Sequence, residues 1–343
     1  MKAEKITFIG TESVNVFVNQ GVEAALTESV GDNEIILYVW SNDNTVVIGR
    51  NQNAYAECRV EALESGGGLL ARRLSGGGAV YHDGGGLNYT FIAANENLDK
   101  ERNFAVVERA LRSFGIETER SGRNDLLCGG AKVGGCAYYR RGGASLHHGT
   151  LIVSTPPERI AEYLTPPSEK FSGKMVKSVS ARVAPLADKA AGITVGAVAA
   201  ALKAAFASEY PDAVFTEETP MRTGPERLLS WVAYFASDEW RYGRKEEYNL
   251  RMPVALFGAE AQLRAVVDGD KIVSAVIDSD GMEAEKICAV RERLTGADLK
   301  GSVSAAASAG GERGGLSDED GAAADAAAAD ILARAAEVWY EKV

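Results

Sequence analysis

The stretch RRLSGGGAVYHD, residues 72–83, carries the densest signal in the sequence. Its three consecutive glycines let the backbone bend tightly and approach a ligand closely, and their N–H groups can form an anion-binding concavity. The two arginines before them add permanent positive charge in a fork geometry that suits phosphate or carboxylate. A glycine-rich turn between strands, with solvated arginines, is the alternative interpretation. The stretch fits neither the GxxxxGK[ST] phosphate loop nor a complete GxGxxG fingerprint, so a dinucleotide site is poorly supported.

Short apolar and β-branched segments flank this loop and predict strands. Two of them, at 34–40 (EIILYVW) and 45–49 (TVVIG), are separated by the turn-like sequence SNDN. Further strands are expected at 69–74, 79–81, 87–93, 126–128, 132–139 and 146–153. Helices are expected at 103–114, where apolar residues recur at helical spacing, at 157–164, and from Thr194 to about Ser208. This pattern predicts a mixed, largely antiparallel sheet with flanking helices.

A second motif block follows, with GRNDL at 122–126, KVGG at 132–135 and HHGTL at 147–151. If the last two segments pair as a hairpin, one sheet presents a lysine, a carboxylate and a histidine. A lysine ammonium in a dry site can neutralise charge that develops when a carboxylate attacks an α-phosphate, and a nearby aspartate can hold that lysine or Mg²⁺. All three histidines of the chain lie in the two blocks. Structural histidines are the alternative, and no cysteine–histidine set has zinc-ligand spacing.

Further elements are expected beyond residue 224, with a boundary to a second, smaller unit in the polar stretch 243–251. Residues 225–236 and 283–294 have helical patterns, and 253–266 and 271–277 read as strands around a turn at 268–270. The Gly-, Ala-, Ser- and Asp-rich residues 301–324 suit a flexible linker, and 325–342 a last helix. We therefore expect three parts: residues 1–245, residues 251–300, and a low-complexity linker with a terminal helix over 301–343.

Composition excludes several classes. A net charge of −11 in 343 residues argues against a broad basic surface for nucleic acid. The opening apolar run is too short for a signal peptide, and no stretch reaches the roughly 18 apolar residues of a membrane span. Four cysteines without a CxxC suggest reduced thiols. We expect a cytoplasmic protein that binds neither nucleic acid nor membranes.

Taken together, the motifs resemble the lipoate–protein ligase A family. The matching segments keep the family's order: TVVIGRNQN at 45–53, the block at 72–83, the three segments of the second block, and KSVSARV at 177–183. Glu23, in VEAAL, also fits an early family helix. The resemblance implies an α+β fold of the biotin/lipoate ligase type, with a catalytic domain over 1–245 and a small α+β C-terminal accessory domain over 251–300.

The resemblance also implies an activity. Lipoate and ATP with Mg²⁺ would form lipoyl-AMP, and a lysine of an apo carrier would then attack it. Family carriers are the lipoyl domains of 2-oxoacid dehydrogenase complexes and the glycine-cleavage H protein. Lys132 matches the catalytic lysine, and no dedicated metal site is implied, with Asp125 a candidate ligand for the Mg²⁺ of ATP. The residues matching ATP- or lipoyl-AMP-binding positions are Arg73, Ser75, Gly76, Gly77, Gly78, Ala79, Val80, Tyr81, His82, Asp125, Lys132 and His148.

This sequence also departs from the family pattern. Gly86 stands where the family usually has an asparagine, and the lysine motif continues with Gly134-Gly135-Cys136 instead of serines. Three alternatives therefore stay open. They are an octanoyl or lipoyl transferase with a cysteine thioester at Cys128 or Cys136, a biotin ligase, and a non-catalytic homologue that binds lipoate or a carrier.

Overall fold

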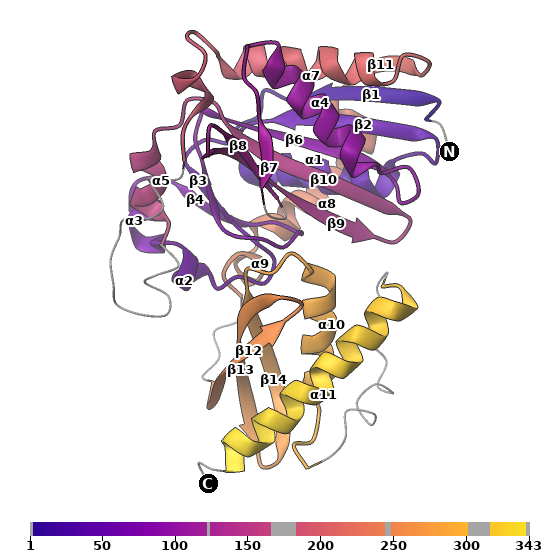
Figure 1. Cartoon of the computed structure of the whole chain (residues 1–343). Helices are drawn as coiled ribbons and strands as arrows, with labels where there is room; N and C mark the ends of the chain where they lie inside the picture. Colours follow the sequence, from indigo (N-terminus) through magenta and orange to yellow (C-terminus); the bar gives the residue numbers. More distant parts are fainter. Residues whose placement is uncertain (1–2, 122–123, 166–182, 244–247, 301–315, 341–343) are drawn as a thin grey trace. The chain divides into compact units, whose positions relative to one another are not determined.

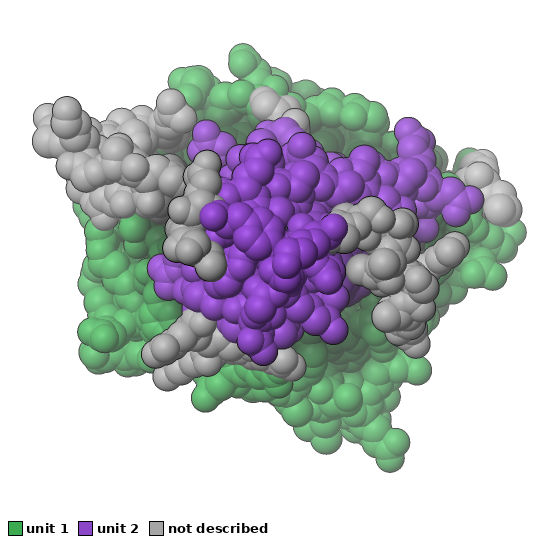
Figure 2. All heavy atoms as spheres, turned by 90° about the horizontal axis from the view of Figure 1, so that it is seen from below, with its two compact units in different colours: residues 1–48, 54–73, 79–241 green, residues 49–53, 74–78, 242–343 purple. Residues whose placement is uncertain are grey.

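The computed structural model describes residues 3–121, 124–165, 183–243, 248–300 and 316–340. The chain divides into two compact units, coloured separately in Figure 2. Unit 1 comprises Met1–Ile48, Ala54–Arg73 and Ala79–Arg241, and unit 2 comprises Gly49–Asn53, Leu74–Gly78 and Tyr242–Val343. Two short segments from the N-terminal half thus belong to unit 2, which the sequence did not indicate. The three-part domain division stays a prediction.

Unit 1 is built on an eight-stranded mixed sheet (Figure 1). The strand order is β11-β1-β2-β6-β10-β9-β8-β7. Strand β1 runs parallel to both β2 and β11, and the other pairs are antiparallel. The expected mixed, largely antiparallel sheet is confirmed. Its strands are β1 (Lys5–Gly10), β2 (Glu34–Trp40), β6 (Gly86–Ala94), β7 (Glu119–Ser121), β8 (Asp125–Cys128), β9 (Ala131–Arg141), β10 (Ala144–Ile152) and β11 (Val214–Glu218).

Unit 1 also contains a three-stranded sheet in the order β4-β3-β5. Its strands are β3 (Thr45–Ile48), β4 (Leu69–Arg72) and β5 (Val80–His82). In the sequence, β4 ends where the glycine-rich loop begins and β5 starts just after it. The short helices nearby in sequence are α2 (Ala54–Glu57), α3 (Val60–Ser65) and α5 (Pro157–Tyr163).

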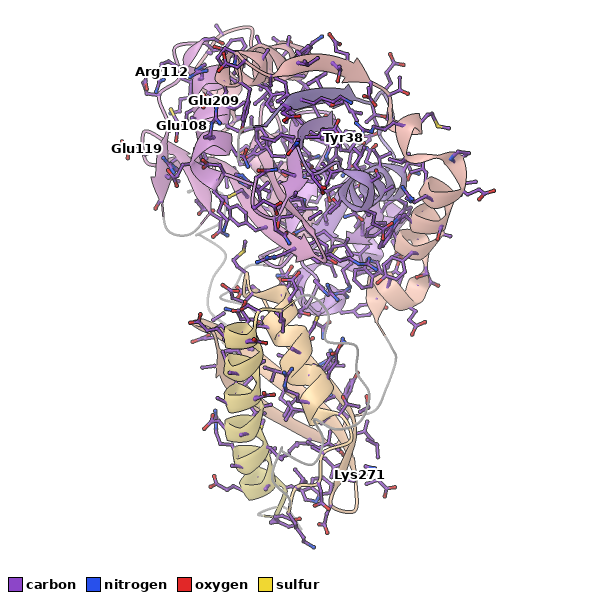
Figure 3. All side chains as sticks on the ribbon, turned by 90° about the vertical axis from the view of Figure 1, so that its right-hand side faces the viewer. Tyr38, Glu108, Arg112, Glu119, Glu209 and Lys271 are labelled. Atoms are coloured by element: carbon purple, nitrogen blue, oxygen red, sulfur yellow. The ribbon has the colours of Figure 1, made fainter. Side chains whose placement is uncertain are left out.

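One face of the large sheet is covered by α4 (Lys100–Arg112) and α7 (Val195–Glu209) (Figure 1). The Asp99 side chain accepts from Arg102 N at 3.1 Å, so α4 begins three residues before the expected position. Thr194 caps α7 as predicted, accepting from Ala197 N at 3.1 Å. An ion pair between Arg102 on α4 and Glu209 on α7, with Nε and Oε1 3.1 Å apart, joins the two helices. Glu209 is labelled in Figure 3.

The opposite face carries α1 (Val16–Ser29), against which α8 (Pro225–Ala236) packs. The Asn15 side chain caps α1, accepting from Phe17 N and Val18 N. The short elements η2 (Leu186–Asp188), η3 (Pro220–Thr223) and α9 (Asp238–Tyr242) complete the described elements of this unit. The main apolar core lies on the α4 and α7 face, where Phe91 and Phe206 are fully buried with their rings 6.0 Å apart.

Unit 2 contains an antiparallel sheet of β12 (Leu250–Leu256), β13 (Ala259–Asp268) and β14 (Lys271–Ser279) with helices α10 (Ala284–Leu294) and α11 (Asp318–Tyr340). Buried and exposed residues alternate along β12, as expected for a sheet with one face in a core. Aliphatic side chains of that face pack on α10 and α11. None of the described helices is long and apolar enough to cross a membrane.

Two expectations for this unit were wrong. The single strand predicted over 253–266 is broken by a tight turn, since Phe257 and Gly258 both have positive φ, at 50° and 78°. Helix α11 begins at Asp318, within the segment predicted as linker. Alanine has the highest helix propensity, and the Ser317 hydroxyl accepts from Asp320 N at 3.1 Å, which provides a helix start. Residues 301–315 lie outside the described residues.

Candidate functional site

A buried carboxylate organises the α1 face of the large sheet. Glu23 on α1 is only 3% exposed. Its Oε1 accepts a hydrogen bond from Thr90 Oγ1 on β6 at 2.7 Å and lies 2.8 Å from His148 Nδ1 on β10. Trp40 Nε1 in turn donates to Thr90 Oγ1 at 3.2 Å. Three strands and one helix therefore hold a single carboxylate oxygen in place.

A buried cation lies in the electric field of this carboxylate. Arg73 is 9% exposed and donates from Nη1 to the Val47 carbonyl at 3.2 Å. Burial lowers the pKa of Arg73 to about 10, and the charge of Glu23 opposes that shift. The guanidinium stays protonated at neutral pH, so the site holds a buried positive charge whose hydration is largely lost, which favours interaction with an anion.

His82 is a neutral member of the same region. Its Nδ1 lies 3.0 Å from Asn42 Nδ2, and its Nε2 lies 3.0 Å from Thr150 Oγ1. Burial, with a smaller contribution from the positive charge of Arg73, lowers the pKa of His82 to about 3. His82 can therefore orient its neighbours through hydrogen bonds at neutral pH but carries no charge.

Lys132 and Asp125 form an ion pair on β9 and β8, with Nζ and Oδ1 2.6 Å apart. Both side chains are partly exposed, at 36% and 44%. A Cβ added at Gly135 would lie 3.3 Å from Lys132 Nζ, so the ammonium lies over a bare stretch of backbone. The pair is accessible to a ligand, unlike the buried Glu23 region.

The glycine-rich loop packs on the segment 49–53 within unit 2. Arg50 N donates to the Ser75 carbonyl at 2.9 Å, and a Cβ at Gly49 would lie 2.1 Å from the Gly77 carbonyl oxygen. Position 49 therefore requires glycine. Gly77 has φ of 89° and donates its N–H to the Gly281 carbonyl at 3.2 Å. Ser75, Gly76 and Gly77 are buried and Gly78 is exposed.

The model of the lipoyl protein ligase A/B catalytic domain matches residues 15–207. Lipoate-protein ligase A of Psychrobacter cryohalolentis is 32% identical over 303 residues, which cover 86% of this chain and 89% of that protein. The chain belongs to the lipoyl protein ligase A/B family. Lipoate-protein ligase A of Bdellovibrio bacteriovorus is 33% identical over 305 residues, covering 87% and 90%. The predicted enzyme class, a lipoate–protein ligase, is confirmed.

Solved structures of the family share this fold. The P. falciparum LipL1 in complex with lipoate has a TM-score of 0.77 at 24% identity, covering 96% of this chain and 99% of that one. A bipartite lipoate protein ligase from Thermoplasma acidophilum, studied with its E2 lipoyl domain, has a TM-score of 0.61 at 26% identity, covering 73% and 100%. A lipoate-protein ligase A bound with ATP has a TM-score of 0.59 at 25% identity, covering 71% and 99%.

Some residues of the family's motifs form hydrogen bonds within unit 1. Arg72, expected to add charge for a ligand, donates from Nε to the Trp240 carbonyl at 2.7 Å and from Nη2 to the Arg241 carbonyl at 3.0 Å. It therefore holds α9, because carbonyls at the C-terminal end of a helix lack intrahelical partners. The hydroxyl of Tyr81 donates to Asn44 Oδ1 at 3.1 Å. The motif residues 122–123 and 177–182 lie outside the described residues.

The thioester alternative would need a reactive thiol. Cys136 pairs with Gly149, the residue between His148 and Thr150 on β10, so its side chain lies on the other face of the sheet. Burial raises the pKa of the Cys136 thiol to about 11, which makes it a poor nucleophile. Cys128 is half-buried at the end of β8. Cys136 is thus poorly suited to that alternative.

No group of three or more His, Cys, Asp or Glu side chains that could hold a metal occurs among the described residues. A cavity of about 480 Å³ lies on the α7 side of the sheet, lined by residues that include Phe8, Val39, Leu87, Ala199 and Lys203. None of the predicted site residues lines it. Sequence reasoning did not single out the hydrogen-bonding residues Thr90 and Asn42, because a lone hydroxyl or amide in a strand or turn carries no recognisable spacing signal, and it placed Thr150 in a motif without giving it a role.

Proposed function

We propose that this lipoate–protein ligase activates lipoate with ATP to lipoyl-AMP and transfers the lipoyl group to a lysine of an apo carrier. The relatives bind the required molecules: one family structure holds lipoate, another ATP, and a third ligase was studied with its E2 lipoyl domain. The observation that carries the proposal is the accessible Lys132–Asp125 pair, 2.6 Å apart, in a chain of this family.

In the first step, a carboxylate oxygen of lipoate attacks the α-phosphorus of ATP. The bond from that phosphorus to the β-phosphate oxygen breaks, and pyrophosphate leaves. The phosphorus oxygens and the leaving group gain negative charge, and the Lys132 ammonium is the group that would stabilise it. Asp125, 2.6 Å away, would hold that ammonium in position. No protein nucleophile is required, because the substrate supplies the attacking oxygen.

In the second step, the neutral amine of the carrier lysine attacks the acyl carbon of lipoyl-AMP. An amide bond forms, AMP leaves with the electron pair of the broken C–O bond, and the nitrogen loses a proton. We propose apo lipoyl domains of 2-oxoacid dehydrogenase complexes, and the glycine-cleavage H protein, as carriers.

For the remaining site residues we propose ligand-binding roles. The buried charge of Arg73 and the backbone of Ser75–Tyr81 would bind the nucleotide, and His82 and His148 would line the acyl pocket. Mg²⁺ would enter with the ATP phosphates, since the described residues form no dedicated metal site and Asp125 offers a single nearby carboxylate.

The first experiment is intact-mass spectrometry of an apo lipoyl domain incubated with this protein, lipoate, ATP and Mg²⁺. We expect one lipoyl group on the carrier, and none when ATP is omitted or when the acceptor lysine is replaced by arginine. H protein as carrier tests the second partner in the same assay. Transfer from an octanoylated carrier without ATP would establish the transferase alternative. Lipoate binding without any modified carrier would establish a non-catalytic homologue.

A further inference from the structure

A directed chain of hydrogen bonds runs through the buried region of unit 1. The hydroxyl of Tyr38, labelled in Figure 3, donates to Asn19 Oδ1 at 3.3 Å. Asn19 Nδ2 then donates to Asn42 Oδ1 at 3.1 Å, so the Asn42 amide presents its Nδ2 to His82 Nδ1 at 3.0 Å. Because an amide nitrogen donates, His82 Nδ1 accepts. In a neutral ring the single proton is then on Nε2.

The chain continues toward β6. His82 Nε2–H donates to Thr150 Oγ1 at 3.0 Å. The Thr150 hydroxyl therefore donates its own hydrogen bond to Asn88 Oδ1, 2.6 Å away. This sequence of donors and acceptors fixes the orientation of the Asn88 amide. Its Oδ1 faces Thr150, and its Nδ2 therefore does not. Asn88 is 3% exposed, and its Nδ2 has no hydrogen-bond partner among the residues that the structure describes.

The location of this unpaired donor is informative. Asn88 pairs with Trp40 on one neighbouring strand and with Thr150 on the other, and directly paired residues point to the same face. Thr150 in turn pairs with Gly135 on β9, over which the Lys132 ammonium lies. The amide of Asn88 and the ammonium of Lys132 thus share one face of the sheet, with Thr150 on the strand between them.

We propose that Asn88 Nδ2 donates a hydrogen bond to an anionic oxygen of a bound substrate, either the lipoate carboxylate or the α-phosphate of ATP. Buried donors in native proteins are almost always paired, so an exception requires an explanation, and at Asn88, unlike in the core, the neighbouring Lys132 ammonium makes a bound anion the fitting acceptor. Gly86 stands where the family usually has an asparagine, so Asn88 carries the single side-chain amide of β6. This assignment rests on the proposed function and adds a ligand-binding residue to it.

The test is the variant Asn88→Asp. The change is isosteric and keeps an acceptor for Thr150, but it replaces the proposed donor with a second oxygen. Isothermal titration with lipoate alone and with ATP–Mg²⁺ alone separates the two candidate acceptors. We expect the affinity for one of the two to fall about 10- to 100-fold, the effect of losing a hydrogen bond to a charged group.

A pH series gives a readout that a purely structural role would not move. A carboxyl group at this buried position should have a raised pKa, and its protonated form can donate a hydrogen bond. The affinity of Asn88→Asp, relative to that of the wild-type protein at the same pH, should therefore recover as the pH is lowered from 8 to 6.

Asn103 on α4 offers a matched control. It is 1% exposed, and its Nδ2 also has no hydrogen-bond partner among the described residues, but it lies in the core on the α4 and α7 face. Asn103→Asp introduces the same chemical change away from the proposed site. Its ligand affinities should equal those of the wild-type protein, while any loss of thermal stability should resemble that of Asn88→Asp.

A folded Asn88→Asp variant with wild-type affinity for both lipoate and ATP would overturn the assignment. If that variant does not fold, Thr150→Val serves instead, because it removes the bond that orients the amide. Its affinity for one substrate should fall severalfold, and an unchanged affinity would count equally against Asn88. Binding is measured without a carrier, so wild-type protein that binds lipoate yet ligates nothing would refute the proposed ligation alone.

Discussion

His147 and His148 are neighbours on β10, but their side chains enter opposite environments. His148 bonds to the buried Glu23 on the α1 face. His147 lies among aromatic rings on the α4 face, stacked on Tyr138 at 4.4 Å and 5.0 Å from the Phe104 ring, and neither of its nitrogens has a hydrogen-bond partner among the described residues. Strand alternation thus gives this sheet a polar face, where we propose that the chemistry takes place, and an apolar face that packs in the core.

The strongest test of this division compares two lysines. Lys132→Ala removes the ammonium proposed to stabilise the charge of the transition state, and lipoate-dependent release of pyrophosphate should fall by about 100- to 1000-fold. The side chain is partly exposed, so thermal stability should change little. Lys100→Ala is the control, because Lys100 lies 3.8 Å over the Tyr138 ring on the other face. An unchanged rate for Lys132→Ala would remove this lysine from the mechanism.

The two histidines supply a second test at adjacent positions. His148→Leu should weaken lipoate binding or activation by about 10- to 100-fold, since His148 is proposed to line the acyl pocket. His147→Leu should leave the same steady-state kinetic constants within about twofold. Equal losses in the two variants, after correction for the folded fraction, would show that the division between the faces does not determine function.

The pH dependence of stability tests a buried histidine from each region. Burial lowers the pKa values of both His82 and His147 to about 3, from about 6.5 in the unfolded chain. The unfolded state therefore binds more protons below pH 6.5. Their stabilising contribution is fully present above that pH and is lost as the pH falls, by about 2 kcal/mol for each histidine at pH 5.

Urea unfolding at pH 7.5 and pH 5 measures this loss. His147→Phe should remove about half of it, because the phenyl ring suits the aromatic surroundings and does not titrate. The carboxyl of Glu34 has its pKa lowered to about 2, mainly through hydrogen bonds from Arg222 and Thr7 that outweigh its burial. It affects stability only as the pH falls below about 4.5, outside this range. An identical pH dependence in His147→Phe and wild type would refute the contribution of His147.

Local signals made much of the fold predictable. Alternating or continuous apolar runs predicted the central strands, and Thr194 predicted the start of α7. The turn at Phe257 was missed because a bulky residue rarely adopts positive φ, and the start of α11 was missed because its alanines and aspartates read as linker. In both places the residue types favour one local structure and the chain adopts another.

The candidate site was only partly predictable. Family resemblance indicated Arg73 and His148, but no spacing rule connects them to Glu23, which lies 125 residues from His148 in sequence. The contribution of Thr90 depends on the order of strands in the sheet, which brings β6 and β10 together. Long-range pairing of this kind has no local signature, so the hydrogen-bond network emerges only from the tertiary structure.

The smallest expected effect concerns Gly86, at the start of β6 in the large sheet. An added Cβ would have only ordinary contacts there, the nearest being the Asp83 carbonyl oxygen at 3.7 Å. Gly86→Asn should therefore fold, and it restores the asparagine usual in the family. One added hydrogen bond should raise kcat/KM for lipoate about two- to tenfold. Gly84→Asn is the control, because a Cβ at position 84 meets nothing within 4 Å. A gain in neither variant would show that a side-chain amide at position 86 makes no productive hydrogen bond to the ligand.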